Sequence, residues 1–310
     1  MTPESDHCQR WANGAHSWRH ASDGGFDAAR FAVAPIPEAT ARAFVQRHHY
    51  AGTYPAARLA YGLLTTDDAL AVDGTEVDGL ALVGVAALSI PMRESVLTGV
   101  FPDLDPYRQS LELGRFILTD TPANAESWFL GRLFEQATAD GVRGVVSFAD
   151  PMPRRREVLD PDGTTRVETV TPGHVGMIYQ ATNGYACGRS TARSLTYLPR
   201  HGLVVPDRTL SKIRNAESGH EGAERYLVTL GATARKAGQA LRPWLTDALN
   251  DLGAVKVRHP GNFRYAWALG SRSERRRCHI AVPRTSYPKP GSHVEQVPTA
   301  RARHQLALIP

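Results

Sequence analysis

Residues 111–190 constrain the fold of this chain more than any other segment. They read as a strand, a capped helix, a buried strand that ends on a carboxylate, and a second helix entry. This order is typical of an α/β protein, in which ligands bind at the carboxyl ends of the strands. Polar and ionisable side chains stand where these elements begin and end: Arg115, Ser127, Asp150, His174, Tyr179 and Asn183. The segment therefore predicts an active site on an α/β frame.

The elements around this segment follow from apolar spacing and turn residues. A proline opens a helix over 37–49, and residues 61–64 and 80–90 read as antiparallel strands. A helix over 124–140 carries apolar residues on one face, as expected when a helix packs on a sheet. The continuous apolar run over 144–150 is typical of a central strand. Together these elements predict a mixed central sheet flanked by helices.

The composition and turn residues divide the chain into four parts. Residues 1–30 lack periodicity and predict a loose arm, and residues 31–205 hold the catalytic domain. Within that domain, residues 152–172 place a DPDG turn between two β-prone arms, which predicts an inserted hairpin. Residues 206–280 form a basic α+β extension, and residues 281–310 are expected to be poorly ordered.

Positive charge is concentrated in the C-terminal part of the chain. Residues 185–310 hold 21 Lys and Arg against 8 Asp and Glu, whereas the preceding residues carry an excess of acidic groups. We expect two helices, over 208–232 and 234–254, and a strand over 259–270 in this basic part. Such segregation of charge predicts a surface that contacts nucleic acid. Biased composition, with Arg preferred over Lys, remains the alternative explanation.

Several classes of protein are disfavoured by the sequence. No run of 18 apolar residues is present, and the N-terminal residues lack the apolar core of a secretory signal. The 3 cysteines are scattered without the spacing of a zinc site, which suits a reducing compartment. We therefore expect a cytoplasmic protein that is not inserted in a membrane.

The strand and helix start around residues 112–127 resemble the GNAT acyltransferase superfamily, although no glycine occurs between Arg115 and Ser127. A narrower resemblance rests on HHYAG, ELGRFIL, NAES, SFADP and GHVGMIYQATN, which occur in this order. Their combination resembles the Mom family of phage DNA-modification proteins, which are divergent members of the GNAT superfamily. This resemblance implies an enzyme that converts adenine in duplex DNA to its carbamoylmethyl derivative at the exocyclic amine. That modification protects DNA from restriction.

The resemblance also implies the roles of individual residues. The catalytic candidates that it supplies are His49, Tyr50, Arg115, Asp150 and Tyr179. An anionic group of a small-molecule donor, such as acetyl-CoA or a related compound, would bind at the start of the helix after Arg115, at Asn124, Ala125, Glu126 and Ser127. Within this scheme Asp150 acts as a general base, alone or with Tyr179. Arg115 orients Asp150 or stabilises charge on the donor.

Basic side chains would hold the DNA. The expected contacts to DNA are Arg154, Arg155 and Arg156 in the hairpin, together with Lys212, Arg214, Arg272, Arg275, Arg276 and Arg277. Adenine would be flipped out of the duplex, and Tyr54, Tyr61 and Tyr107 could stack on it.

The same residues also allow purely structural or other roles. Arg115 and Asp150 could form a structural ion pair, and His48 lies on the apolar stripe of its helix, where a packing role is as reasonable as a functional one. Because two histidines and a carboxylate can ligate iron, His48, His49 and His174 could instead serve a metal. Two other functions remain: a non-catalytic nucleic-acid-binding protein on a GNAT frame, and a conventional acyl-CoA N-acyltransferase.

Overall fold

A computed structural model describes residues 7–12, 15–20, 26–49, 52–122 and 124–289. The chain divides into two compact units. The first unit holds the N-terminal residues through 149 together with 175–189 and 262–289, and the second holds 150–174 and 190–261. The second unit thus holds the predicted hairpin at 152–172 and the helix expected over 208–232. The strand expected at 259–270 falls mainly in the first unit.

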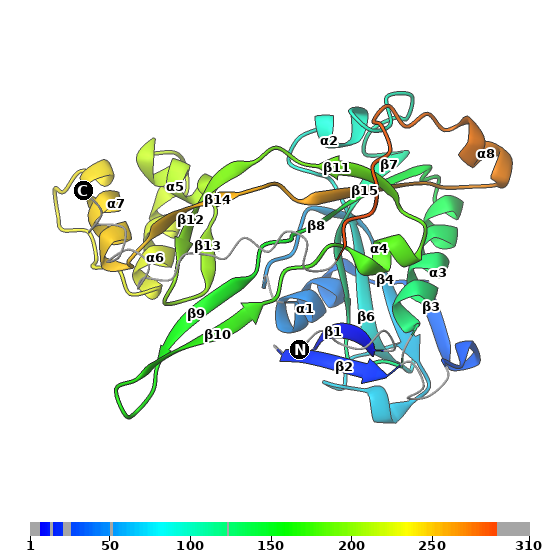
Figure 1. The fold of residues 1–310 in the computed structure, drawn as a ribbon, viewed down its shortest axis with the longest axis horizontal. Helices are drawn as coiled ribbons and strands as arrows, with labels where there is room; N and C mark the ends of the chain where they lie inside the picture. Colours follow the sequence, from blue (N-terminus) through cyan, green and yellow to red (C-terminus); the bar gives the residue numbers. More distant parts are fainter. Residues whose placement is uncertain (1–6, 13–14, 21–25, 50–51, 123, 290–310) are drawn as a thin grey trace. The chain divides into compact units, whose positions relative to one another are not determined.

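The first unit is built on an eight-stranded mixed sheet (Figure 1). Its path is β11 (Tyr185–Arg189), β15 (Phe263–Ala268), β8 (Gly144–Ala149), β7 (Ser110–Leu118), β6 (Leu80–Ser89), β4 (Ala57–Thr65) and β3 (Phe31–Pro35), with β5 (Glu76–Val77) beside β6. Among the strands of this sheet that the structure describes, β7 and β8 pair in parallel and the other neighbours are antiparallel. The predicted mixed α/β architecture is confirmed.

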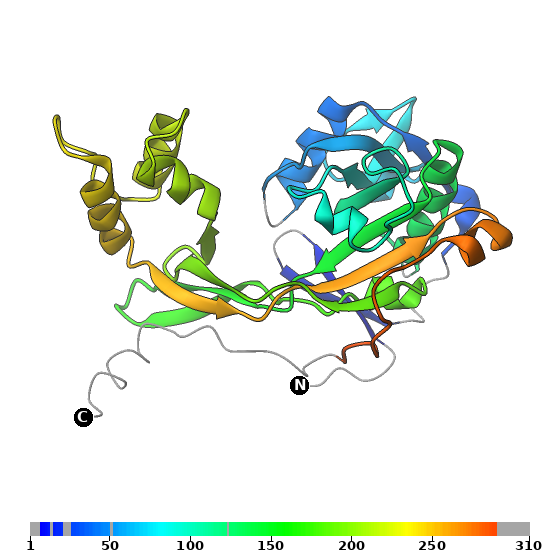
Figure 2. The same cartoon turned by 90° about the horizontal axis from the view of Figure 1, so that it is seen from above.

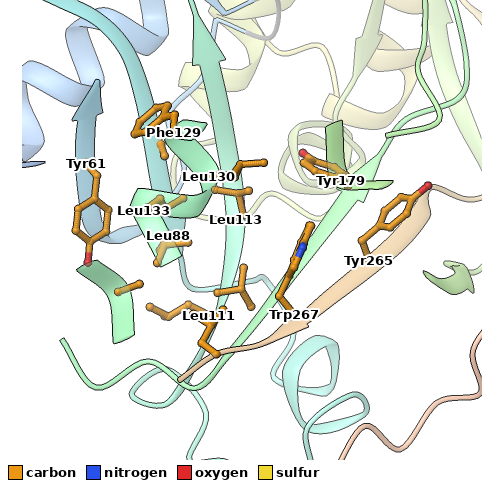
Figure 3. Packing of buried hydrophobic residues seen from close by; sticks show 14 of the residues in the cluster. Tyr61, Leu88, Leu111, Leu113, Phe129, Leu130, Leu133, Tyr179, Tyr265 and Trp267 are labelled. Atoms are coloured by element: carbon orange, nitrogen blue, oxygen red, sulfur yellow. The ribbon is translucent and has the colours of Figure 1, made fainter. Parts of the chain in front are cut away.

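Helices cover both faces of this sheet. On one face, α3 (Ala125–Ala139) buries Phe129, Leu130 and Leu133 against apolar strand residues (Figure 3). On the other, α1 (Glu38–His48) buries Phe44 and Val45. Burial of each such side chain is worth roughly 1.5–3 kcal/mol, so the helical spacing seen in the sequence fixes both helices on the sheet. The described part of the unit also contains the short helices α2 (Ser95–Thr98), α4 (Met177–Ala181) and α8 (Arg272–Arg277).

The second unit combines a hairpin with a small α+β body. Strands β9 (Arg154–Leu159) and β10 (Thr165–Thr171) form the predicted inserted hairpin. A three-stranded sheet has the order β13 (Leu203–Val205), β12 (Arg193–Leu198) and β14 (Val255–His259). Helices α5 (Asp207–Arg214), α6 (His220–Thr229) and α7 (Leu241–Asp251) pack around Trp244 and Leu227, and they lie together on one side of this sheet (Figure 2).

Three expectations about local structure differ from the structure. The helix expected over 208–232 is broken into α5 and α6, because Ala216 (φ +51°) after α5 and Gly219 (φ +80°) before α6 adopt left-handed conformations that end helical continuity. The expected loose arm contains paired strands β1 (His7–Ala12) and β2 (Ala15–His20), then a 3₁₀ turn (Ala28–Arg30). The strand expected at 259–270 does not stay in the basic extension, because β15 pairs with β8 and β11 in the central sheet.

The start of the expected poorly ordered tail is also held in place. Thr285 donates its backbone N–H to the Ala186 carbonyl (2.9 Å), and the hydroxyl of Tyr287 donates to the Gly184 carbonyl (2.9 Å). These bonds lay residues 285–287 along the edge strand β11. Residues 290–310 lie outside the described part of the chain. Within the described residues, no helix is long and apolar enough to span a membrane.

Candidate functional site

Asp150 follows the last residue of β8 and belongs to the second unit, where its carboxylate is surrounded by donors. Its Oδ1 accepts from the backbone N–H of Met152 and from His259 Nε2, both at 2.9 Å, and its Oδ2 faces Arg154 Nη2 at 3.2 Å. Burial opposes ionisation of Asp150. The hydrogen bond from His259 and the charge of Arg154 outweigh this effect and lower the pKa of Asp150 to about 2.

His259 is the partner that sequence reasoning missed. It ends β14 and is fully buried, and its Nδ1 accepts the backbone N–H of Gly261 at 3.0 Å. The proton of a neutral imidazole must then sit on Nε2 and point to Asp150. Gly261 has a φ of +97°, and a Cβ there would lie 1.9 Å from the Ser190 carbonyl oxygen. Glycine at this turn therefore helps to fix the histidine.

The hydrogen bonds on Asp150 limit its strength as a base. A carboxylate that accepts from two N–H donors and faces a guanidinium binds a proton weakly. The predicted general-base role requires at least one of these bonds to be released when substrate binds. The arrangement as it stands suits a carboxylate that holds its neighbours in place.

His174 lies on the same segment of the second unit. Its backbone N–H donates to the Asp150 carbonyl at 2.7 Å. Its surroundings lower the pKa of His174 by desolvation, and the nearby charge of Asp150 partly opposes that shift. This shift favours a neutral imidazole.

Arg115 lies on β7 in the first unit, and its guanidinium is used to hold a loop. Its Nε donates to the Thr53 carbonyl at 2.9 Å, and its Nη2 donates to Thr53 Oγ1 at 2.8 Å. Charge-assisted bonds of this kind are worth roughly 1.5–3 kcal/mol each. Arg115 thus holds the backbone and side chain of Thr53. His49 caps α1 by donating its backbone N–H to the Val45 carbonyl. Tyr50 lies outside the described residues.

His48 is engaged in structural contacts. Its Nε2 lies 3.0 Å from Asp73 Oδ2, and its ring packs on Phe44 with the centroids 4.5 Å apart. Arg47 binds the same carboxylate oxygen at 2.8 Å. Burial of Asp73 raises its pKa, but hydrogen bonds from His48 and Thr75 outweigh that effect and hold the pKa well below its usual range. The contacts with Asp73 and Phe44 thus support a packing role for His48.

The start of α3 carries the predicted donor-binding residues. Asn124 adopts a left-handed conformation, with a φ of +72°, and its side chain makes no capping bond. Ser127 donates its hydroxyl to the Asn124 carbonyl at 3.1 Å, and Ala125 is buried. Thr121, one turn earlier, has a buried hydroxyl that finds no hydrogen-bond partner among the described residues. The positive end of the helix dipole thus meets a loop with spare hydrogen-bonding capacity.

Tyr179 lies on α4 within an aromatic cluster of the first unit (Figure 3). Its ring meets Tyr265 and Trp267 edge-on, with centroids 5.4 Å apart in both pairs. Gln180 donates to the Tyr265 hydroxyl at 3.1 Å, and burial raises the pKa of Tyr265. Tyr179 is itself buried, so the cluster positions its ring firmly.

Of the tyrosines expected to stack on adenine, Tyr61 does not fit that role. It is fully buried in the first unit, and its hydroxyl donates to Asp140. Burial, followed by this hydrogen bond, raises the pKa of Tyr61 well above its usual range. Tyr54 is partly buried beneath the guanidinium of Arg42, 4.8 Å from its ring centroid.

The basic residues expected to contact DNA are divided between the units. In the hairpin, Arg154 faces Asp150, and Arg156 binds Glu168 at 2.7 Å. Lys212 and Arg214 lie in the last turn of α5. The exposed residues Arg272, Arg275, Arg276 and Arg277 all lie on α8, which is capped by Ser271 and Glu274. The ion pairs of the hairpin compete with any contact to phosphate.

The candidate metal ligands do not fit a metal centre. Within the described parts of the chain, no group of three or more His, Cys, Asp and Glu side chains is arranged to hold an ion. His48 is committed to Asp73 as described above. We therefore assign no chemistry to iron at these residues.

A comparison with known protein families bears on the resemblance found in the sequence. Residues 30–156 match the Mom protein family. The predicted resemblance to Mom is thus confirmed over this part of the chain, which contains His48, His49, Arg115, Ser127 and Asp150. Tyr179 and His259 lie beyond the part that matches Mom. No curated protein matches the chain.

Two solved structures show weaker similarity. A tandem GNAT protein from the clavulanic acid biosynthesis pathway, without AcCoA, aligns with 78% of this chain and 99% of its own, at 9% identity and a TM-score of 0.34. A CoA-dependent acyl-homoserine lactone synthase, MesI, aligns with 40% of this chain and 69% of its own, at 18% identity and a TM-score of 0.20. The resemblance to the Mom family therefore rests on residues 30–156 alone.

Proposed function

We propose that this protein modifies adenine in duplex DNA, converting the exocyclic amine to its carbamoylmethyl derivative and thereby protecting the DNA from restriction. The observation that carries this proposal is the match of residues 30–156 to the Mom family. That match is in keeping with a phage or prophage transferase that acts on DNA in the cytoplasm. Duplex DNA and a small-molecule donor are its proposed partners.

The chemistry requires a proton acceptor close to the target nitrogen. In the reaction, a bond forms between the amine nitrogen and the methylene carbon of the incoming group, the bond between that carbon and the leaving group of the donor breaks, and one amine proton passes to a base. Because the amine is conjugated with the ring, it is a weak nucleophile, and removal of the proton as the bond forms lowers the barrier. We propose Asp150 for this step, with Tyr179 and His49 as further catalytic residues and Arg115 as the residue that positions the loop at residue 53.

The donor would bind at the start of α3. Asn124, Ala125, Glu126 and Ser127 present the first turn of a 15-residue helix, whose dipole favours an anionic group. The buried hydroxyl of Thr121 adds a hydrogen-bond donor at the same loop. The donor class that we propose is an anionic compound of the coenzyme A type whose transferable methylene carbon already carries a leaving group.

Analysis of nucleosides tests the proposal. DNA from cells that express the chain is digested to nucleosides and examined by mass spectrometry, alongside DNA from cells that express the Asp150→Asn variant. We expect a modified deoxyadenosine in the first sample and none in the second. Unmodified DNA from cells with abundant, folded protein would contradict the proposal.

A non-catalytic DNA-binding protein is the second candidate. The observation that favours it is the full set of donors on Asp150, which leaves a poor base in the structure. A conventional acyl-CoA N-acyltransferase would use the α3 site without needing the basic helices. Binding of duplex DNA without any change of its nucleosides would support the binding protein, and acylation of a small amine would support the acyltransferase.

A further inference from the structure

Arg189 has an unusual environment at the end of β11. The bulge that interrupts the pairing of β11 with β15 includes Gly188, whose φ is +72°. The guanidinium of Arg189 lies over the ring of Phe263, with its central carbon 4.3 Å from the ring centroid. This stacking uses one flat face of the guanidinium and leaves the N–H groups on its rim for other partners.

One of these rim groups is buried without a partner. Nη2 of Arg189 is shielded from solvent and makes no hydrogen bond to any described residue. Arg264 on the neighbouring strand donates from its Nη2 to the Cys187 carbonyl at 3.2 Å, while its Nε is likewise buried without a partner among the described residues. Burying a charged N–H without an acceptor is costly, so this position is stabilised when an acceptor arrives.

The position of Arg189 in the first unit corresponds to a ligand-binding edge. Phe263 pairs with Ala149, the last residue of β8, and Arg189 pairs with Phe263. Arg189 therefore stands at the carboxyl end of β8. In α/β sheets this edge is where ligands commonly bind.

We propose that Arg189 is a binding residue for a phosphate group of the substrate. A guanidinium presents a planar pair of N–H donors that matches two phosphate oxygens, and its charge is retained at all ordinary pH values. Phosphate reaches this edge from one of two sources: the backbone of the target DNA, or a phosphorylated donor of the coenzyme A class. The choice between these two sources of phosphate rests on the proposed function. The binding of phosphate by Arg189 does not depend on that function.

The first experiment uses inorganic phosphate as the probe. Thermal unfolding of the full chain is followed in phosphate and in chloride at equal ionic strength, for the wild type, Arg189→Ala, Arg189→Lys and Arg58→Ala. Arg58 is an exposed arginine on β4 and serves as the matched control. We expect phosphate to raise the melting temperature of the wild type and of Arg58→Ala, because a ligand that binds only the native state stabilises it. The rise is reduced in Arg189→Lys and absent in Arg189→Ala.

The second experiment separates the two sources of phosphate. Affinity for a labelled duplex is measured as a function of salt, and affinity for coenzyme A is measured in parallel. If DNA supplies the phosphate, Arg189→Ala weakens duplex binding about 10-fold. It also lowers the slope of log affinity against log salt by roughly 0.9. If the donor supplies it, duplex binding is unchanged and coenzyme A binding weakens by a similar factor.

Folded Arg189→Ala and Arg189→Lys proteins that match the wild type in all three assays would overturn the inference and leave Arg189 as a packing residue on Phe263. If Arg189→Ala does not fold, Arg189→Lys decides, because it keeps the charge and loses the planar fork. A wild-type protein that is stabilised by phosphate through Arg189 but leaves DNA unmodified would contradict the proposed function while supporting the phosphate site.

Discussion

At the scale of single residues, Asp150 is the centre of the proposed chemistry. We expect Asp150→Asn to reduce DNA modification by about 10²–10⁴-fold, the usual contribution of a general base. The amide can still accept from His259, so the fold and the affinity for DNA should be retained. Nucleoside analysis together with thermal unfolding measures both effects. Full modification by the variant would exclude the base, and an unfolded variant would favour a purely structural role.

The pH dependence of stability provides a separate test of the Asp150 environment. The pKa of this carboxyl is lowered from 3.8 to about 2 on folding, so its contribution to stability is present above pH 4 and lost as the pH falls toward 2. The shift corresponds to about 2 kcal/mol in the free energy of unfolding. We expect the wild type and Asp150→Asn to differ most above pH 4, and the difference to shrink below pH 3. A difference that is constant across acid unfolding curves would argue against this environment.

At the scale of elements, the β9–β10 hairpin should contact DNA. Replacement of Arg154, Arg155 and Arg156 by Ala should weaken binding and flatten its salt dependence, because contacts to phosphate release counterions. Since Glu168 binds Arg156, Glu168→Gln should free this arginine and strengthen binding. A duplex titrated at several salt concentrations measures both variants. Equal affinity and equal slope for the triple variant and the wild type would show that the hairpin has another role.

At the scale of the whole molecule, positive charge is carried by separate helices in two units. Truncation near residue 199 is not a clean test of its role, because it removes β15 from the central sheet. Glutamine replacements on α8 (Arg272, Arg275, Arg276 and Arg277) and on α5 (Lys212 and Arg214) leave both units intact. Each lost phosphate contact should lower the salt slope by roughly 0.9 with little dependence on DNA sequence. Unchanged slopes in both variants would show that the segregation of charge reflects only biased amino-acid composition.

Local patterns in the sequence determined most of the elements and part of the candidate site. The helical spacing of Leu130 and Leu133 predicted α3, and the apolar run before Asp150 predicted β8, because both signals depend on neighbours a few residues apart. The DPDG turn predicted the hairpin for the same reason. The combination of short motifs also predicted the resemblance to the Mom family that residues 30–156 show, since order along the chain needs no folded structure.

Tertiary structure alone decided which distant residues meet. His259 lies 109 residues beyond Asp150, and nothing in its own neighbourhood marks it as the partner of that carboxylate. Phe263 opens β15, whose membership of the central sheet depends on pairing with β8 and β11. The same pairing sets Arg189 at the carboxyl end of β8. Strand pairing and burial act between segments that are far apart in the chain, so the basicity of Asp150 and the environment of Arg189 emerge only when the chain has folded.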